Sequence, residues 1–180
     1  PIMLVVGFAA GGVADVTARG VAQKLSDHLG QPVVVDNRPS AGGIVAAEAV
    51  AKSAPDGNTL LLMSNGNAVS ASLFRSLPYD TLADFAPVST LGFFDVAVVA
   101  SADARIDSMA SLLAYAKANP GKLDIGTIND GSTQHLAAEL FRSMTGLEAT
   151  VVPYKGSPAV ITALRANDVQ VAFEMLAPVV

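Results

Sequence analysis

The sequence has no cysteine, few aromatic residues and few basic ones. The absence of cysteine excludes disulfide bonds, thiolate metal sites and a cysteine nucleophile. Eleven lysines and arginines stand against 16 aspartates and glutamates, and the basic residues form no cluster. A formal net charge of −5 without a basic patch argues against nucleic acid and against an anionic membrane surface as partners.

A hydrophobic run long enough to cross a bilayer is also missing, since a spanning helix needs about 20 apolar residues. The apolar opening of the chain, Ile2–Ala14, is shorter, contains three glycines and lacks a basic segment before it. We therefore predict a buried strand followed by a loop, rather than a signal peptide or a membrane-embedded segment.

Hydrophobic residues make up 51% of the chain and mean hydropathy is +0.46, so the chain can bury a substantial core. Short apolar runs alternate with helical stretches, which is the pattern of βαβ units. The expected strands are Ile2–Val6, Pro32–Val35, Thr59–Met63, Val96–Ala100, Leu123–Thr127, Thr150–Val152 and Val169–Phe173, with a further extended segment at Pro87–Leu91. The expected helices lie at about Ala14–Leu29, Ile44–Ser53, Val69–Leu73, Ser108–Ala118, Thr133–Thr145 and Ser157–Ala166.

Two series of βαβ units predict an α/β fold with two lobes. We place lobe one at residues 1–95 and lobe two at 96–180, joined by extended crossover segments near 92–101. Each lobe is expected to hold a mainly parallel sheet flanked by helices.

The first strand leads through the glycine-containing loop Gly7–Val13 into a helix. Gly11 and Gly12 let the backbone approach a ligand, and the start of the helix offers free N–H groups to an anion. A tight turn without a ligand explains the pattern equally well. The spacing of a phosphate or dinucleotide loop is not met. Asp15 either caps its own helix or accepts a hydrogen bond from a ligand.

A second strand–loop–helix junction runs from Thr127 to His135. Ser132 and Thr133 can cap the helix, or their hydroxyls and the amides beyond can hold a carboxylate. Taken alone, plain capping is the simpler interpretation. Two such junctions, one in each predicted lobe, favour a clamp that holds a small anion between two helix N-termini. His135 either donates to the ligand or braces the loop.

Other polar motifs give weaker signals. Ser64–Asn67 follows the third strand, where parallel sheets often bind ligands, although an ordinary turn fits it too. His28 and His135 lack the spacing of a zinc site. No G-x-S-x-G motif occurs, and Asp15 has no obvious acid or base partner, so catalysis is poorly supported.

The chain resembles the substrate-binding receptors of tripartite tricarboxylate transporters, the Bug-type family, over essentially its whole length. The matching motifs are Gly11-Gly12 with Asp15, Leu29–Val35, Asn37-Arg38, Ala41–Gly43, Ala54–Gly57, Leu77–Asp80, Asp84–Val88, Ala118–Leu123, Gly131-Ser132 with His135-Leu136, and Val152–Gly156. The resemblance implies a type II periplasmic-binding-protein fold with a cleft between two lobes. It implies a periplasmic receptor, not an enzyme, that needs no cofactor or metal and hands a small carboxylate to a membrane permease.

Carried over by position, the resemblance nominates ligand-binding residues in both lobes. They are Phe8, Gly11, Gly12, Asp15 and Asn65 in lobe one, and Gly131, Ser132, Thr133, His135 and Glu174 in lobe two. Family members continue well past the position of Val180, so we expect a fragment or an unusually short form.

Two alternative functions use the same residues. A signalling protein would close on the acid and present its surface to a membrane sensor. An enzyme would show turnover that disappears in Asp15→Asn or His135→Ala.

Overall fold

The chain divides into two compact units, Pro1–Phe93 and Phe94–Val180. The computed structural model describes residues 1–176. Both units hold a sheet that is wholly or mainly parallel and is flanked by helices, so the predicted α/β class is confirmed. None of the helices within the described residues is both long and apolar enough to cross a membrane.

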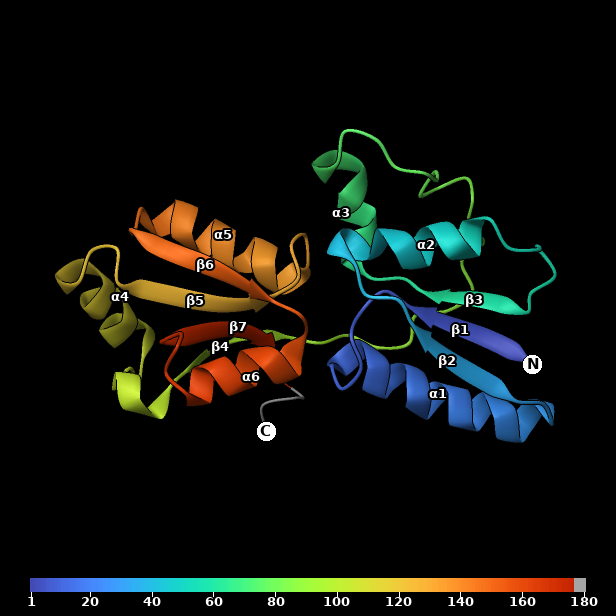
Figure 1. Cartoon of the computed structure of the whole chain (residues 1–180), viewed down its shortest axis with the longest axis horizontal. Helices are drawn as coiled ribbons and strands as arrows, with labels where there is room; N and C mark the ends of the chain where they lie inside the picture. The colour runs from blue at the N-terminus through green and yellow to red at the C-terminus, as the bar shows by residue number, and fades with distance from the viewer. Residues whose placement is uncertain (177–180) are drawn as a thin grey trace. The chain divides into compact units, whose positions relative to one another are not determined.

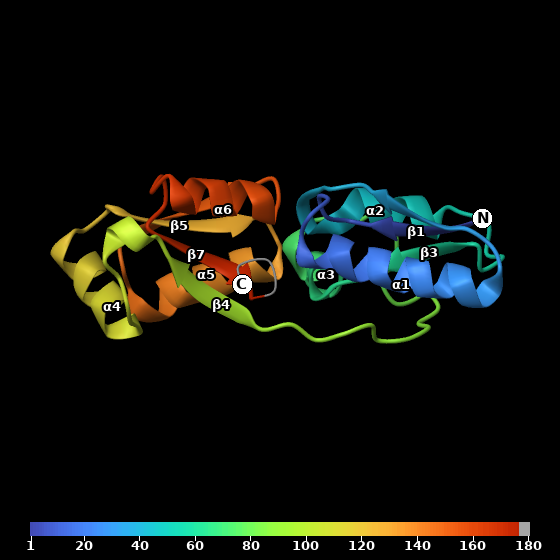
Figure 2. The same ribbon diagram turned by 90° about the horizontal axis from the view of Figure 1, so that it is seen from below.

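The first unit is built around a three-stranded parallel sheet with the order β2-β1-β3. The strands are β1 (Ile2–Val6), β2 (Val33–Asn37) and β3 (Thr59–Leu62). Helix α1 (Val13–Leu29) and helix α2 (Ile44–Ala51) lie on opposite sides of this sheet (Figures 1 and 2). Strand β1 is central because it is almost wholly apolar, and its Leu4 and Val6 pack against Ala18 and Ala22 of α1.

The second unit holds a four-stranded sheet with the order β4-β7-β5-β6, in which only β4 runs antiparallel to its neighbour. The strands are β4 (Val96–Ala100), β5 (Leu123–Ile128), β6 (Ala149–Tyr154) and β7 (Val171–Met175). The helices are α4 (Met109–Ala118), α5 (Thr133–Thr145) and α6 (Ser157–Arg165). Helices α5 and α6 lie on opposite sides of the sheet (Figures 1 and 2).

Close packing in the second unit depends on one missing side chain. A Cβ added to Gly126 of β5 would lie 3.0 Å from Val169 Cγ2 and 3.4 Å from Val160 Cγ1. Glycine therefore lets α6 sit tightly on the sheet. On the other side, Leu112 and Ala116 of α4 and Ala138 of α5 join the buried core with Ile125.

One predicted element of the first unit is wrong in detail. Helix α3 (Asn65–Leu73) begins directly after β3, so Asn65–Asn67 forms its first turn rather than a break. A capping box between Ser64 and Asn67 starts the helix early, and Gly66 is buried within it. Pro87–Leu91, expected as an extended segment, pairs with no strand of the described sheets.

Candidate functional site

The loop after β1 is held in shape by a buried carboxylate. Asp15, in the first turn of α1, is only 3% exposed. Its Oδ2 accepts hydrogen bonds from the Gly11 N–H at 2.9 Å and from Arg19 Nε at 3.1 Å. Its Oδ1 lies 2.9 Å from Arg19 Nη2, an ion pair without hydrogen-bond alignment. Asp15 therefore braces the loop that leads into its own helix.

The charge state of Asp15 follows from these contacts. Burial alone would raise the pKa of this carboxyl. Hydrogen bonds from Arg19, Gly11 and Asn37, together with the positive charge of Arg19, outweigh burial and hold the pKa below its usual range. Asp15 is thus a stable anion near neutral pH, with its Oδ2 taken up by hydrogen bonds from the protein itself.

The same network reaches the carbonyl of Phe8. Arg19 Nη2 donates to Asn37 Oδ1 at 3.0 Å, and Asn37 Nδ2 donates to the Phe8 carbonyl at 3.1 Å. The Phe8 side chain packs on the core that includes Leu4. Asn37 thus ties the end of β2 to the loop after β1, a role that the sequence alone did not single out.

A second set of hydrogen bonds joins the turn after β2 to the start of α3. Asn67 accepts from the Ser64 N–H at 3.0 Å and donates to the Gly42 carbonyl at 3.2 Å. Gly42 precedes Gly43 in a short 3-10 turn (Ala41–Gly43), and a Cβ on Gly7 would lie 2.9 Å from Gly43 Cα. The ends of β1 and β3 are therefore locked together. Asn65, nominated from sequence, is exposed in the first turn of α3.

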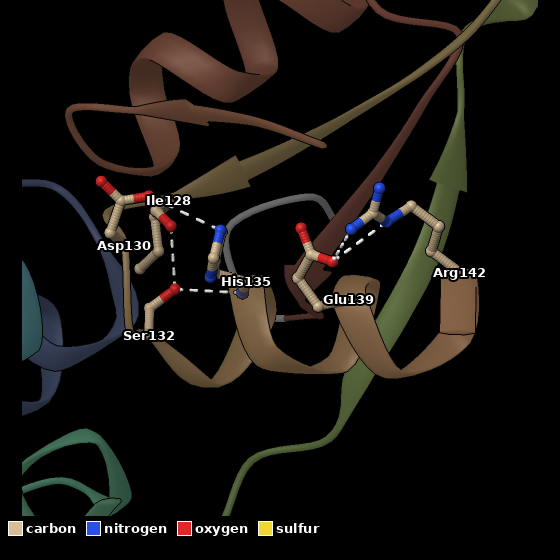
Figure 3. A network of polar contacts seen from close by, with 6 residues as sticks. All are labelled: Ile128, Asp130, Ser132, His135, Glu139 and Arg142. Atoms are coloured by element: carbon tan, nitrogen blue, oxygen red, sulfur yellow. Dashed lines mark hydrogen bonds and ion pairs between the residues drawn. The ribbon is translucent and has the colours of Figure 1, made fainter. Parts of the chain in front are cut away.

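In the second unit, Ser132 is the N-cap of α5. Its Oγ accepts from the His135 N–H at 3.1 Å and donates to the Ile128 carbonyl at 2.8 Å (Figure 3). Gly131 turns the chain with a φ of 74°, a conformation that favours glycine. The prediction that Ser132 caps the helix is thus confirmed. Thr133 is the first residue of α5.

His135 lies in the first turn of α5 and is partly exposed. Its Nε2 is 3.5 Å from Asp130 Oδ1, as Figure 3 shows, and its side chain is 20% exposed. Its Nδ1 is buried and has no hydrogen-bond partner among the described residues. This nitrogen is one of the polar atoms near the loop that the protein leaves unsatisfied.

Thr127 Oγ1 and Glu174 Oε2 are two further such atoms. Glu174 lies near the end of β7 and is 1% exposed. Its Oε1 accepts from Gln134 Nε2 at 2.9 Å and from the Met175 N–H at 2.8 Å, while Oε2 is buried with no partner among the described residues. Gln134, the second residue of α5, is 3% exposed, and sequence reasoning missed it because a lone glutamine carries no motif.

Both sets of residues occupy the carboxyl ends of parallel strands, and each set adjoins the N-terminus of a long helix. Such a terminus leaves backbone N–H groups without partners inside the helix and carries partial positive charge. The arrangement suits the binding of an anion. Within residues 1–176, no three His, Asp or Glu side chains gather closely enough to hold a metal ion.

The sequence matches the family described as "Tripartite tricarboxylate transporter family receptor" over residues 17–180. It is also 46% identical over 167 residues to Protein BugT of Bordetella pertussis, a match that covers 91% of this chain and 51% of BugT. The chain thus spans about half the length of this relative.

Three solved structures are similar to this chain over almost its whole length. Rpa4515 of R. palustris with adipate is 38% identical with a TM-score of 0.94, covering 98% of this chain and 60% of that one. MatC of Rhodopseudomonas palustris with bound malate is 28% identical with a TM-score of 0.89, covering 99% and 61%. The periplasmic binding protein BugD is 30% identical with a TM-score of 0.87, covering 97% and 58%.

These neighbours are binding proteins, which confirms the predicted periplasmic-binding-protein fold and the resemblance on which it rested. The chain belongs to the tripartite tricarboxylate transporter receptors, a family of solute-binding receptors rather than enzymes.

Proposed function

We propose that the protein is a periplasmic receptor that binds a small carboxylate with loops from both units and delivers it to a membrane permease. The observation that carries the proposal is the repeated junction in which a buried parallel strand passes through a glycine turn into a helix N-terminus, once in each unit. Adipate and malate, the ligands of two similar structures, are both small dicarboxylates.

In this proposal the backbone supplies most of the contacts. The amides around Gly12 at the start of α1 and around Gly131, Ser132 and Thr133 at the start of α5 donate to the ligand's carboxylates. Phe8, Asn65, His135 and Glu174 line the ligand, as the family resemblance implies. Gly11 and Asp15 contribute by fixing the first loop, since they bond to each other. Because these backbone amides are already held in place, they lose little conformational entropy on binding, which favours affinity.

Titration calorimetry with mono-, di- and tricarboxylates tests the receptor. We expect heat and saturation with at least one of these acids, and no turnover of it. A folded sample that gives no heat with any acid contradicts carboxylate binding. Capture of the permease by the loaded receptor tests the delivery step, and capture of a membrane sensor instead would favour the signalling alternative.

A further inference from the structure

The Glu174 carboxylate is buried with only one of its oxygens satisfied. Oε1 accepts two hydrogen bonds, from Gln134 Nε2 and from the Met175 N–H, while Oε2 has no partner among residues 1–176. Two donors on one oxygen fix the orientation of the carboxylate. Oε2 is therefore an acceptor that the described part of the chain leaves without a hydrogen bond.

Among residues 1–176, no cationic side chain forms an ion pair with Glu174. The ion pairs found among residues 1–176 involve other acidic groups: Asp15, Asp36, Glu48, Asp130 and Glu139. A buried carboxylate without a cation is costly unless its acceptors receive hydrogen bonds. Among the described residues no such donor reaches Oε2.

The position of Glu174 indicates where that donor comes from. Its partner Gln134 is the second residue of α5, so the carboxylate adjoins the helix N-terminus that we propose binds an anion. An anionic ligand placed there meets the negative charge of Glu174 as well as the helical amides. A hydrogen-bond donor on the ligand would turn the repulsion by Glu174 into an attraction.

We propose that Glu174 Oε2 accepts a hydrogen bond from a hydroxyl or ammonium group on the bound acid. The protein then prefers a carboxylate that carries such a donor over the same acid without it. This inference rests on the proposed function, because it assigns a ligand class to the same site. Glu174 would act as a specificity determinant, and Gln134 would position it.

Succinate, malate and aspartate test the proposal, because they share a four-carbon dicarboxylate chain and differ in one substituent. Malate adds a hydroxyl group and aspartate an ammonium group. We expect calorimetry to show that malate or aspartate binds at least about tenfold more tightly than succinate, as one hydrogen bond to a charged acceptor allows. Tighter binding of malate would identify the donor as a hydroxyl group, and tighter binding of aspartate would identify it as an ammonium group.

The variant Glu174→Gln separates this role from a structural one. Its amide oxygen can keep the bonds from Gln134 and Met175, which places the NH₂ group where Oε2 was. For aspartate a donor then faces a donor, so its advantage over succinate should disappear. The malate hydroxyl can turn and accept from the NH₂ group, but the bond to a charged acceptor is lost, so the advantage of malate over succinate should fall. A purely structural Glu174 would instead weaken all three acids by the same factor.

The outcomes are distinct. Equal or tighter binding of succinate by the wild-type protein overturns the inference, and so does a preference that Glu174→Gln leaves unchanged. Binding of succinate alone overturns it while leaving the receptor function intact, whereas no binding of any carboxylate removes both. Because the wild-type ranking needs no variant, the test holds even if Glu174→Gln unfolds.

Discussion

Asp15 stabilises the folded chain through charge, and the effect should depend on pH. Its contacts with Arg19 and Gly11 lower its folded pKa below the unfolded value of about 3.9. The stabilisation is therefore fully present above about pH 4 and is lost as pH falls through the folded pKa. Asp15→Asn should cost about 1–3 kcal/mol at pH 7 and less at pH 3.

Urea unfolding followed by circular dichroism at both pH values measures this difference. Asp27→Asn is a matched control, since Asp27 lies exposed on the same helix and bonds only to Gln23 among the contacts found. It should change stability little at either pH. Equal losses for Asp15→Asn at pH 7 and pH 3 would show that the carboxylate's charge does not matter.

Gly131 should matter for binding in a way that an equivalent glycine does not. Gly131 and Gly146 flank α5, and both have a positive φ, 74° and 65°. Alanine strains either position by about 1 kcal/mol, so the two variants should lose similar stability. Only Gly131→Ala disturbs the amides of the proposed anion site, so only it should weaken carboxylate binding, by about tenfold or more.

Calorimetry and thermal melting of the two variants with the best-binding acid provide the measurement. If Gly146→Ala weakened binding as much as Gly131→Ala, the loss would reflect general strain on α5, and the site would lie elsewhere.

At the level of elements, two glycines should respond in opposite ways to alanine. Gly126→Ala brings a Cβ to 3.0 Å from Val169, which precedes β7, and to 3.4 Å from Val160 of α6, so these neighbours must shift and the second unit should be destabilised by about 1–3 kcal/mol. Gly20 lies in the interior of α1 with nothing within 4 Å of an added Cβ. Gly20→Ala should therefore stabilise the first unit by roughly 0.5–1 kcal/mol.

Urea unfolding of both variants tests this pair. A stable Gly126→Ala protein would mean that α6 can shift at little cost, and the close approach at Gly126 would then not be needed for packing.

Periodicity and turn residues were enough to predict most elements. The long helix α1 and its stop at Gly30, with φ of 64°, follow from spacing and from a known helix-ending residue. The start of α3 did not follow, because Asn65–Asn67 has turn composition and only the Ser64–Asn67 capping box turns it into helix. Local composition could not reveal that reciprocal contact.

The site was predictable only in part for a similar reason. Glycine loops between strands and helices mark anion sites in sequence, so Gly12 and Ser132 could be nominated. Asn37, Asn67 and Gln134 could not, because each acts through a partner distant in sequence, such as Glu174 forty residues beyond Gln134. Contacts of that kind carry no local pattern.

At the scale of the whole molecule, the segment between β3 and β4 carries large apolar side chains that are almost fully exposed. Leu82 is 91% exposed, Val88 84% and Phe93 94%. Large apolar side chains exposed together promote association between molecules. We therefore expect the 180-residue chain to self-associate in a concentration-dependent way, or to show low stability.

Size-exclusion chromatography with light scattering across a range of concentrations measures this association. The triple variant Leu82→Ser, Val88→Ser and Phe93→Ser should shift the protein towards monomer. Its melting temperature should change little, because side chains this exposed contribute little packing to the folded units. If the unaltered chain is instead a monomer at every concentration and unfolds in one cooperative step, these residues do not drive association, and their exposure needs another explanation.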